Sequence, residues 1–459
     1  MTITIDDMKY LTVLALVVAL LAPGSVFSQK QKKKTAEPVA APAPGKPDLK
    51  LEDSPVFGKC FTGFALYDPA KGEMLYEYNA DKYFTPASNT KILTLYASMQ
   101  VLGDSIPALQ YQKQGDLLVF WGTGDPSFLN PHLPQNPVVF DFLKNSPEAL
   151  LFCPSNFKDQ RYGSGWMWGD FPYAYQAEKS PFPVYGNVAH FRQSSGKDGT
   201  IEVRPKFLKS LLRYDPTFDV EDYVGREEFE NQFIVSTGTP KGRQTEWHVP
   251  FRYSHAFLAE MLADTLGRSV HVLDAGMMPP PGAATLYSLP ADSLYRVMMQ
   301  DSDNFIAEQL LLLCSWKKNG EMNTDKALEF SIKNHLKDLP DPPKWVDGSG
   351  LSRYNLLTPR SVVKVLDKLQ RTVARERLLN IFPAGGVSGT IRSNYKNGNA
   401  PYVFAKTGTL RNNHCLSGYL LTKSGKLLIF SFMHNNFTIG TNALKKEMEQ
   451  VLRQVYDTI

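Results

Sequence analysis

The chain has 459 residues, of which 43% are hydrophobic and 21% are charged, and its formal net charge is +4 at pH 7. This is the composition of a globular protein with room for roughly two or three domains. The small net charge, without a basic stripe interleaved with aromatic residues, argues against a nucleic-acid-binding protein.

The N-terminal segment predicts export. Residues 10–29 (YLTVLALVVALLAPGSVFSQ) contain an apolar run, a Pro-Gly break and a small-residue cleavage site at 26–28. The run is shorter than the roughly 20 apolar residues that span a bilayer, so we expect a signal peptide over residues 1–28 and no stable membrane anchor. The acidic start MTITIDD is atypical of a signal peptide, which leaves both Met1 and Met8 open as the first residue.

The next part of the chain changes character twice. Residues 29–50 are rich in Lys, Ala and Pro and lack periodicity, which predicts a flexible linker. Strand-like runs flank residues 69–72 and predict a hairpin. From 107 to 250 the chain carries short strands, many aromatics and Gly-rich turns, as in GTGDPSF and YGSGWMWGDFPYAY. This stretch predicts a β-rich inserted domain.

Residues 51–106 and 251–459 carry the pattern of the main domain. Helical periodicity spans 254–267, 290–314 and 359–370, and three strand-like runs follow near the C-terminus. We expect an α/β domain in which the N-terminal hairpin and the C-terminal strands form one antiparallel sheet covered by helices. The last segment is amphipathic, and we expect it to pack behind the final strands rather than lie on a membrane.

The four cysteines, Cys60, Cys153, Cys314 and Cys415, are far apart and form no Cys-x-x-Cys pair. Export would permit disulfides, but buried free thiols are the favoured interpretation. Because no cluster of His, Cys or Asp has the spacing of a metal site, we predict no metal ion.

Ser88 and Lys91 lie three residues apart in TPASNTKILTLYASM, at the predicted start of a helix. Positions i and i+3 share a helix face, so the Lys91 amine reaches the Ser88 hydroxyl. It takes the serine proton if burial or nearby positive charge keeps it neutral. The same spacing recurs at Ser194–Lys197, Ser315–Lys318 and Ser361–Lys364. The pair alone therefore does not distinguish a nucleophile from two polar residues on a helix face.

Two later motifs decide between these interpretations. Ser302-Asp303-Asn304 precedes the apolar run of a predicted helix, and Lys406-Thr407-Gly408-Thr409 ends one strand-like run just before another. Ser-x-x-Lys, Ser-x-Asn and Lys-Thr-Gly in this order are the joint signature of class A β-lactamases and penicillin-binding proteins. These companions favour Ser88 as a nucleophile.

From about residue 55 onward the chain resembles the inserted-domain D-alanyl-D-alanine carboxypeptidase/endopeptidase family, the type-4 (class C) low-molecular-mass penicillin-binding proteins. Besides the three motifs, the segments at 298–312 (MMQDSDNFIAEQLLL), 347–360 (DGSGLSRYNLLTPR) and 383–393 (PAGGVSGTIRS) are similar to that family's landmarks. The resemblance implies a serine β-lactamase/transpeptidase-like fold and no cofactor. It implies cleavage of peptidoglycan stem peptides that end in D-Ala-D-Ala or are cross-linked through D-Ala-diaminopimelate, and acylation by β-lactams.

The resemblance also implies roles. Ser88 attacks the carbonyl of the penultimate D-Ala, Lys91 takes its proton, Ser302 relays a proton to the leaving amine, and Asn304 holds the peptide and Lys91. Lys406 keeps the site positive and so favours a neutral Lys91. The hydroxyls of Thr407 and Thr409 bind the substrate carboxylate, the N–H groups of Ser88 and Thr409 form the oxyanion hole, and Gly408 lets substrate lie against the strand.

Three further assignments compete with structural interpretations. Asp170 and Tyr175 match positions that contact the ammonium-bearing side chain of the stem peptide, although Asp170 could equally cap a turn. Arg353 matches an arginine near the site, with a structural salt bridge as the alternative. Arg411 departs from the family pattern, which affects the expected peptide preference and not the reaction.

Other functions are less consistent with the sequence. A class A β-lactamase has no room for a domain between its first two motifs, whereas here residues 107–250 separate them. An inactive peptidoglycan-binding homologue should have lost a motif residue, and a secreted esterase usually replaces Ser-x-Asn with a tyrosine motif. The signal peptide predicts an extracytoplasmic location, and family analogy places it in a Gram-negative periplasm.

Overall fold

The computed structural model describes residues 47–459 except 194–200, 219–222, 239–244, 274–275 and 399. The predicted signal peptide (1–28) and most of the predicted linker lie outside the described residues. Leu49 and Leu51 are buried in the core that packs against the C-terminal helix, so the ordered fold begins before the predicted linker end at residue 50. No helix among the described residues is long and apolar enough to cross a membrane.

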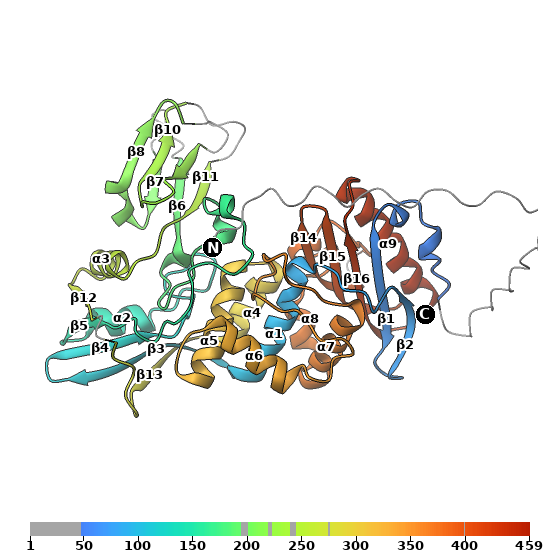
Figure 1. Cartoon of the computed structure of the whole chain (residues 1–459), viewed down its shortest axis with the longest axis horizontal. Helices are drawn as coiled ribbons and strands as arrows, with labels where there is room; N and C mark the ends of the chain where they lie inside the picture. The colour runs from blue at the N-terminus through green and yellow to red at the C-terminus, as the bar shows by residue number, and fades with distance from the viewer. Residues whose placement is uncertain (1–46, 194–200, 219–222, 239–244, 274–275, 399) are drawn as a thin grey trace, which may run out of the picture. The chain divides into compact units, whose positions relative to one another are not determined.

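The main domain is built on a five-stranded antiparallel sheet, as predicted (Figure 1). The N-terminal hairpin pairs with the last strand, so the two ends of the folded chain meet in one sheet. The strand order is β14 (Val403–Leu410), β15 (Asn413–Leu421), β16 (Leu427–Asn435), β1 (Phe61–Asp68) and β2 (Glu73–Tyr78).

Alternation along β16 sends side chains to two cores. Phe430 and Phe432 pack with the C-terminal helix α9 (Thr441–Thr458), which confirms that this amphipathic segment lies behind the strands. Ile429 and Met433 pack on the other face, against a helical core. Its helices are α1 (Lys91–Val101), α4 (Ala291–Gln300), α5 (Asn304–Asn319), α6 (Thr324–His335), α7 (Pro359–Thr372) and α8 (Arg375–Ile381).

The inserted region is β-rich, as predicted, but its boundary at residue 250 is misplaced. A second five-stranded sheet has the order β12 (Val270–Val272), β5 (Ala149–Phe152), β4 (Leu117–Gly122), β3 (Ser105–Gln114) and β13 (Ala284–Pro290). Because β12 and β13 pair with β5 and β3, the insertion continues to about residue 290. The helices α2 (Val138–Asn145) and α3 (His255–Leu266) belong to it.

Two three-stranded sheets complete the inserted region (Figure 1). One has the order β11 (Glu246–Pro250), β6 (Val188–Gln193) and β7 (Ile201–Arg204). The other has the order β8 (Leu212–Asp215), β10 (Phe233–Ser236) and β9 (Val224–Arg226). All four cysteines are free, and of these only Cys60 is not fully buried.

Candidate active site

Ser88 lies in a single turn of 3-10 helix (Ala87–Thr90) that runs directly into α1. Lys91 is the first residue of α1 and is fully buried. Its ammonium nitrogen Nζ donates to Ser88 Oγ at 3.0 Å, to Asn304 Oδ1 at 2.6 Å and to the Ser349 carbonyl at 2.7 Å. The structure thus brings the predicted nucleophile and the asparagine of the Ser-x-Asn motif within hydrogen-bond distance of the amine of the predicted base.

Burial lowers the pKa of Lys91 from 10.5 to about 8, against the opposing effect of three acids, Asp347, Glu308 and Asp303. The sequence analysis expected burial or nearby positive charge, including that of Lys406, to favour a neutral Lys91, and desolvation is the leading cause. Burial and the neighbouring Lys91 also hold the pKa of Lys406 well below its usual value. Both lysines are therefore biased toward the neutral form that a general base requires.

The Ser-x-Asn motif is fixed at the start of α5. Asp303 caps the helix by accepting a hydrogen bond from the Ile306 amide at 2.8 Å. Ser302 adopts a φ of 62°, a region that costs energy for a non-glycine residue. Its Oγ accepts from Lys406 Nζ at 2.8 Å, while Asn304 Nδ2 donates to the Tyr175 carbonyl at 2.9 Å.

The Lys-Thr-Gly motif lies on β14, the edge strand of the main sheet next to the Ser88 turn. Lys406 is fully buried, and its carbonyl accepts from Asn89 Nδ2 at 2.9 Å. Thr407 Oγ1 donates to Thr390 Oγ1 at 2.8 Å, and Thr409 Oγ1 lies 2.8 Å from Nδ1 of His414. Both threonine hydroxyls therefore already have protein partners that orient them.

Gly408 lies close to the turn that carries Ser88. A Cβ atom at this position would lie 2.5 Å from the Pro86 carbonyl oxygen and 2.9 Å from the amide nitrogens of Ser88 and Asn89. The absent side chain makes room for this turn, a role that the sequence did not predict, and the predicted role of leaving room for substrate stays a prediction. Gly408 therefore controls how closely β14 approaches the nucleophile.

Asp170, Tyr175 and Arg353, whose predicted roles competed with structural interpretations, lie at the rim of the site. Tyr175 is 44% exposed, and its backbone carbonyl is the group held by Asn304. Burial of its ring edge, and then Asp170, raise the pKa of the Tyr175 hydroxyl to about 12, so Asp170 and Tyr175 are neighbours as predicted. Arg353 is exposed and donates to the Arg411 carbonyl at 3.4 Å. Within the described residues it makes no ion pair, so the salt-bridge alternative finds no support.

Several contacts at the site were not predicted. They come from loops that are distant in sequence: Ser349 on Lys91, Asn89 on Lys406, Thr390 on Thr407 and His414 on Thr409. Ser349 lies in the DGSG segment and Thr390 in the SGTIRS segment, both of which the sequence had marked as landmarks without assigning a role.

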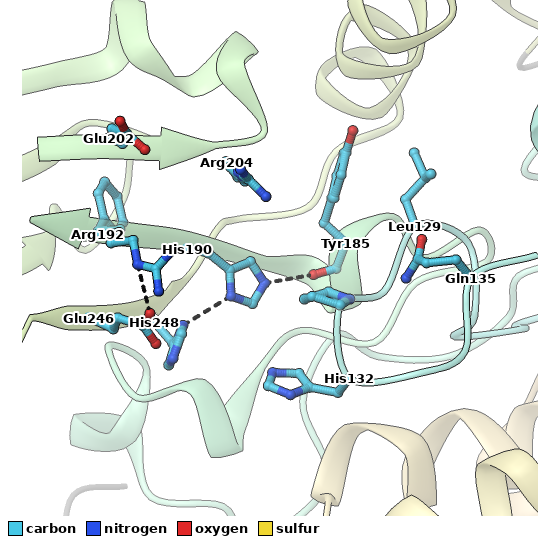
Figure 2. Close-up of a pocket in the computed structure, with 12 residues that line it drawn as sticks. Leu129, His132, Gln135, Tyr185, His190, Arg192, Glu202, Arg204, Glu246 and His248 are labelled. Atoms are coloured by element: carbon cyan, nitrogen blue, oxygen red, sulfur yellow. Dashed lines mark hydrogen bonds and ion pairs between the residues drawn. The ribbon is translucent and has the colours of Figure 1, made fainter. Parts of the chain in front are cut away.

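A pocket of about 450 Å³ lies within the inserted region (Figure 2). His190 on β6 faces His248 on β11 with their Nδ1 atoms 3.0 Å apart, and the ring of His132 is 5.9 Å from that of His190. Arg192 and Glu246 form an ion pair on the same wall. No group of three His, Cys, Asp or Glu residues in the described part of the chain is arranged to hold a metal ion.

Comparison with known proteins identifies relatives that match most of the chain in sequence. The model of the "D-Ala-D-Ala carboxypeptidase 3 (S13) family" matches residues 46–456. The D-alanyl-D-alanine carboxypeptidase DacB of Haemophilus influenzae is 23% identical over 441 residues, covering 86% of this chain and 90% of that protein. A D-alanyl-D-alanine carboxypeptidase of Actinomadura is 26% identical over 443 residues, covering 84% of this chain and 80% of that protein.

Solved structures agree on the fold. The crystal structure of penicillin-binding protein 4 (dacB) of H. influenzae matches with a TM-score of 0.67 at 20% identity, covering 87% of this chain and 96% of that chain. The same protein in complex with a β-lactam matches with a TM-score of 0.61 at 19% identity, covering 86% and 95%. This likeness shows a penicillin-binding/β-lactamase-like α/β fold with additional β-rich sheets. Because the family model spans nearly all of the described residues, this chain belongs to the S13 family of serine D-Ala-D-Ala carboxypeptidases.

Proposed function

We propose that the protein is a serine-type D-Ala-D-Ala carboxypeptidase, D,D-endopeptidase or both, which acts on peptidoglycan stem peptides through an acyl-enzyme. The observation that carries this proposal is the buried Lys91 amine, which contacts both Ser88 Oγ and Asn304 Oδ1. We also propose, from the predicted signal peptide and the family, that it works in the periplasm.

In acylation, Lys91 Nζ takes the Ser88 proton as Oγ bonds to the carbonyl carbon of the penultimate D-Ala. Ser302, held by Lys406, relays this proton from Lys91 to the departing amine as the peptide bond breaks, so that Ser302 is unchanged and Lys91 is neutral again. The amides of Ser88 and Thr409 stabilise the oxyanion. Water then attacks the ester, and Ser88 is regenerated.

Substrate would bind along the open edge of β14. The first half of this strand is covered, because Ala405 donates to the Pro383 carbonyl and Gly385 donates to the Val403 carbonyl. The second half, Thr407–Leu410, is the part that remains for a peptide to extend the sheet by β-strand addition. The hydroxyls of Thr407 and Thr409 would then meet the terminal carboxylate.

The rim supports a preference for peptides that carry an extra amine. Asp170 and the exposed Tyr175 ring provide a carboxylate beside an aromatic surface, which suits a diaminopimelate ammonium group. Asn304 ties this rim to the catalytic cluster through the Tyr175 carbonyl.

A β-lactamase function is less well supported. Class A β-lactamases hydrolyse their acyl-enzyme with the help of a glutamate, carried in a Glu-x-x-Leu-Asn segment. The only glutamate of this chain in such a sequence is Glu376, which is exposed at the start of α8. It is not among the groups that surround Lys91. We therefore expect a long-lived penicilloyl adduct in place of rapid hydrolysis.

The test is mass spectrometry of the protein mixed with benzylpenicillin, followed by peptide mapping. Wild type should gain one penicilloyl adduct on the Ser88 peptide, and Ser88→Ala should gain none. Ser361→Ala, which removes the serine of a second Ser-x-x-Lys pair on α7, is the matched control and should keep the adduct.

Release of D-Ala from a peptide that ends in D-Ala-D-Ala, and cleavage of a cross-linked dimer, then measure the two proposed activities. An adduct without either activity would leave a penicillin-binding protein that is not a peptidase. Penicillin hydrolysis without an adduct would replace the proposal with a β-lactamase.

A further inference from the structure

A glycine-rich loop, Asp347–Gly350, lies between α5 and the turn that carries Ser88. A Cβ on Gly348 would lie 2.5 Å from the Ala307 carbonyl oxygen of α5. A Cβ on Gly350, whose φ is +84°, would lie 1.9 Å from the carbonyl oxygen of Ala87. Only glycine permits both approaches, so the loop is fixed between the two elements.

This position makes Ser349 a link between two buried titratable groups. Its carbonyl accepts a hydrogen bond from Lys91 Nζ at 2.7 Å, and its amide donates to Glu308 Oε1 at 2.7 Å. Glu308 lies four residues after Asn304, on the same face of α5, and is completely buried. The second carboxyl oxygen, Oε2, is buried without a hydrogen-bond partner among the described residues.

The neighbouring acid, Asp347, accepts a very different set of hydrogen bonds. Its carboxylate accepts from the amides of Gly350 and Ser352 at 2.8 and 2.7 Å, and from the side chains of Asn355 and Trp166 at 2.8 and 2.9 Å. Four donors stabilise an ionised carboxylate. Glu308 accepts fewer hydrogen bonds and keeps an unpaired oxygen, so it has less of that stabilisation.

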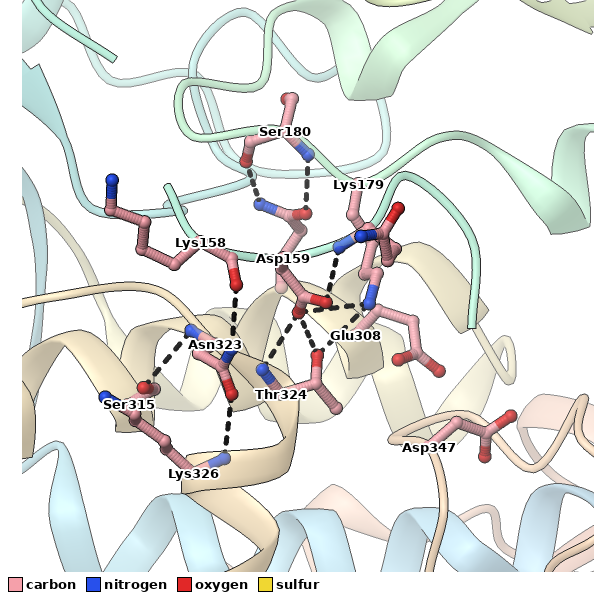
Figure 3. Close-up of polar contacts among 12 residues, drawn as sticks. Lys158, Asp159, Lys179, Ser180, Glu308, Ser315, Asn323, Thr324, Lys326 and Asp347 are labelled. Atoms are coloured by element: carbon pink, nitrogen blue, oxygen red, sulfur yellow. Dashed lines mark hydrogen bonds and ion pairs between the residues drawn. The ribbon is translucent and has the colours of Figure 1, made fainter. Parts of the chain in front are cut away.

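Lys179, the cation whose charge lowers the pKa of Glu308, makes its own contacts to other groups. Lys179 Nζ lies 3.1 Å from Asp159 Oδ2 and donates to Thr324 Oγ1 at 3.1 Å, and Figure 3 shows these contacts with Glu308 standing outside them. Burial, and then the Asp347 charge, raise the pKa of Glu308, although Lys179 acts in the opposite direction.

We propose that Glu308 is a positioning residue whose carboxylate, once ionised, favours the ammonium form of Lys91, and that it thereby sets the pH range in which Lys91 can accept the Ser88 proton. This inference rests on the proposed function. An ionised Glu308 stabilises the ammonium form of Lys91, whereas a protonated Glu308 does not, so the two groups titrate together. The charged groups that face the pair are Asp303, Asp347, Lys179 and Lys406.

Glu308→Gln should lower the pKa of Lys91. Glu308→Gln keeps an oxygen for the Ser349 amide and mimics the protonated acid at every pH. Without the carboxylate charge, the pKa of Lys91 should fall below its value of about 8. The acidic limb of the acylation rate should move to lower pH by on the order of one unit. At the acidic end the two profiles should converge, because wild-type Glu308 is already protonated there.

The experiment measures the second-order rate constant of acylation by a fluorescent penicillin from pH 5 to 10 (about half-unit steps). The control is Asp125→Asn, because Asp125 is also a buried carboxyl whose pKa burial raises to about 6 but lies in the inserted region. We expect a shifted midpoint for Glu308→Gln and an unshifted midpoint for Asp125→Asn.

Two results would overturn the role proposed for Glu308. An equal loss of rate at all pH values would show a merely structural role and overturn it. A separate readout is the wild-type limb itself, which should be broader than a single ionisation because two groups are coupled. A wild-type limb that follows one ionisation would overturn the proposal even if Glu308→Gln fails to fold. Absence of any wild-type acylation would instead refute the proposed function.

Discussion

The distance between β14 and the Ser88 turn is controlled by the missing side chain of Gly408. Three backbone atoms of the turn lie within 3.0 Å of where a Cβ would be placed, and none of them belongs to a flexible side chain. A methyl group there must move either the nucleophile or the strand that carries Thr409. Because catalysis depends on sub-ångström placement of reacting groups, this glycine is a position where a small change has a large effect.

Gly408→Ala should therefore lower the acylation rate constant by at least about tenfold, and by about a hundredfold for a shift near 1 Å. The measurement is the penicillin acylation rate with thermal unfolding as a companion. Gly58→Ala is the control, since a Cβ there meets nothing within 4 Å. A Gly408→Ala variant that acylates at the wild-type rate would show that the turn and the strand separate freely.

Helices and strands that follow from short-range sequence patterns were predicted better than contacts between distant parts of the chain. The Ser88 helix, the apolar run of α5 and the apolar face of α9 follow from short-range periodicity. The contact of Lys91 with the Ser349 carbonyl joins residues 258 positions apart, and no local signal specifies it. The boundary at residue 250 was missed because β13 returns to pair with β3 only after a helical segment that resembles the main domain.

Two strands of the inserted region create a pH-dependent contact. His190 on β6 lies opposite His248 on β11, and burial, followed by the His248 charge, lowers the pKa of His190 from 6.5 to about 4. Between those values the unfolded chain binds more protons at this residue than the folded chain does. Stability should therefore be fully present above pH 6.5 and should decline as the pH falls toward 4.

His190→Gln should flatten that decline, because the titrating group is removed from both states. Urea unfolding at several pH values between 4 and 7 measures it, with the midpoint as the readout. His271→Gln, at an exposed position on β12, should leave the wild-type slope unchanged. Identical slopes for wild type and His190→Gln would show that the pair contributes nothing to acid sensitivity.

In the molecule as a whole, the Gln309 side chain links the inserted region to the catalytic helices by hydrogen bonds. Gln309, on α5, is completely buried. Its Nε2 donates to the carbonyls of Gly124 and Ser180 at 2.8 and 2.9 Å, and its Oε1 accepts from the Ser180 amide at 3.2 Å. Gln309 follows Glu308 directly, so the same turn of α5 that faces the active site also holds the insertion.

Gln309→Leu, which keeps the size but removes the polar atoms, should leave three buried backbone groups unpaired. Each costs about 1–3 kcal/mol, so the attachment should weaken more than either part's own core. We expect calorimetry to resolve two unfolding transitions where wild type shows one, and limited proteolysis to cut the inserted region first. Gln370→Leu on α7, where the side-chain amide donates to Asp367, is the control. A single transition with an unchanged midpoint would mean that the other contacts, among them Asn304 with Tyr175 and Lys179 with Thr324, suffice to join the two parts.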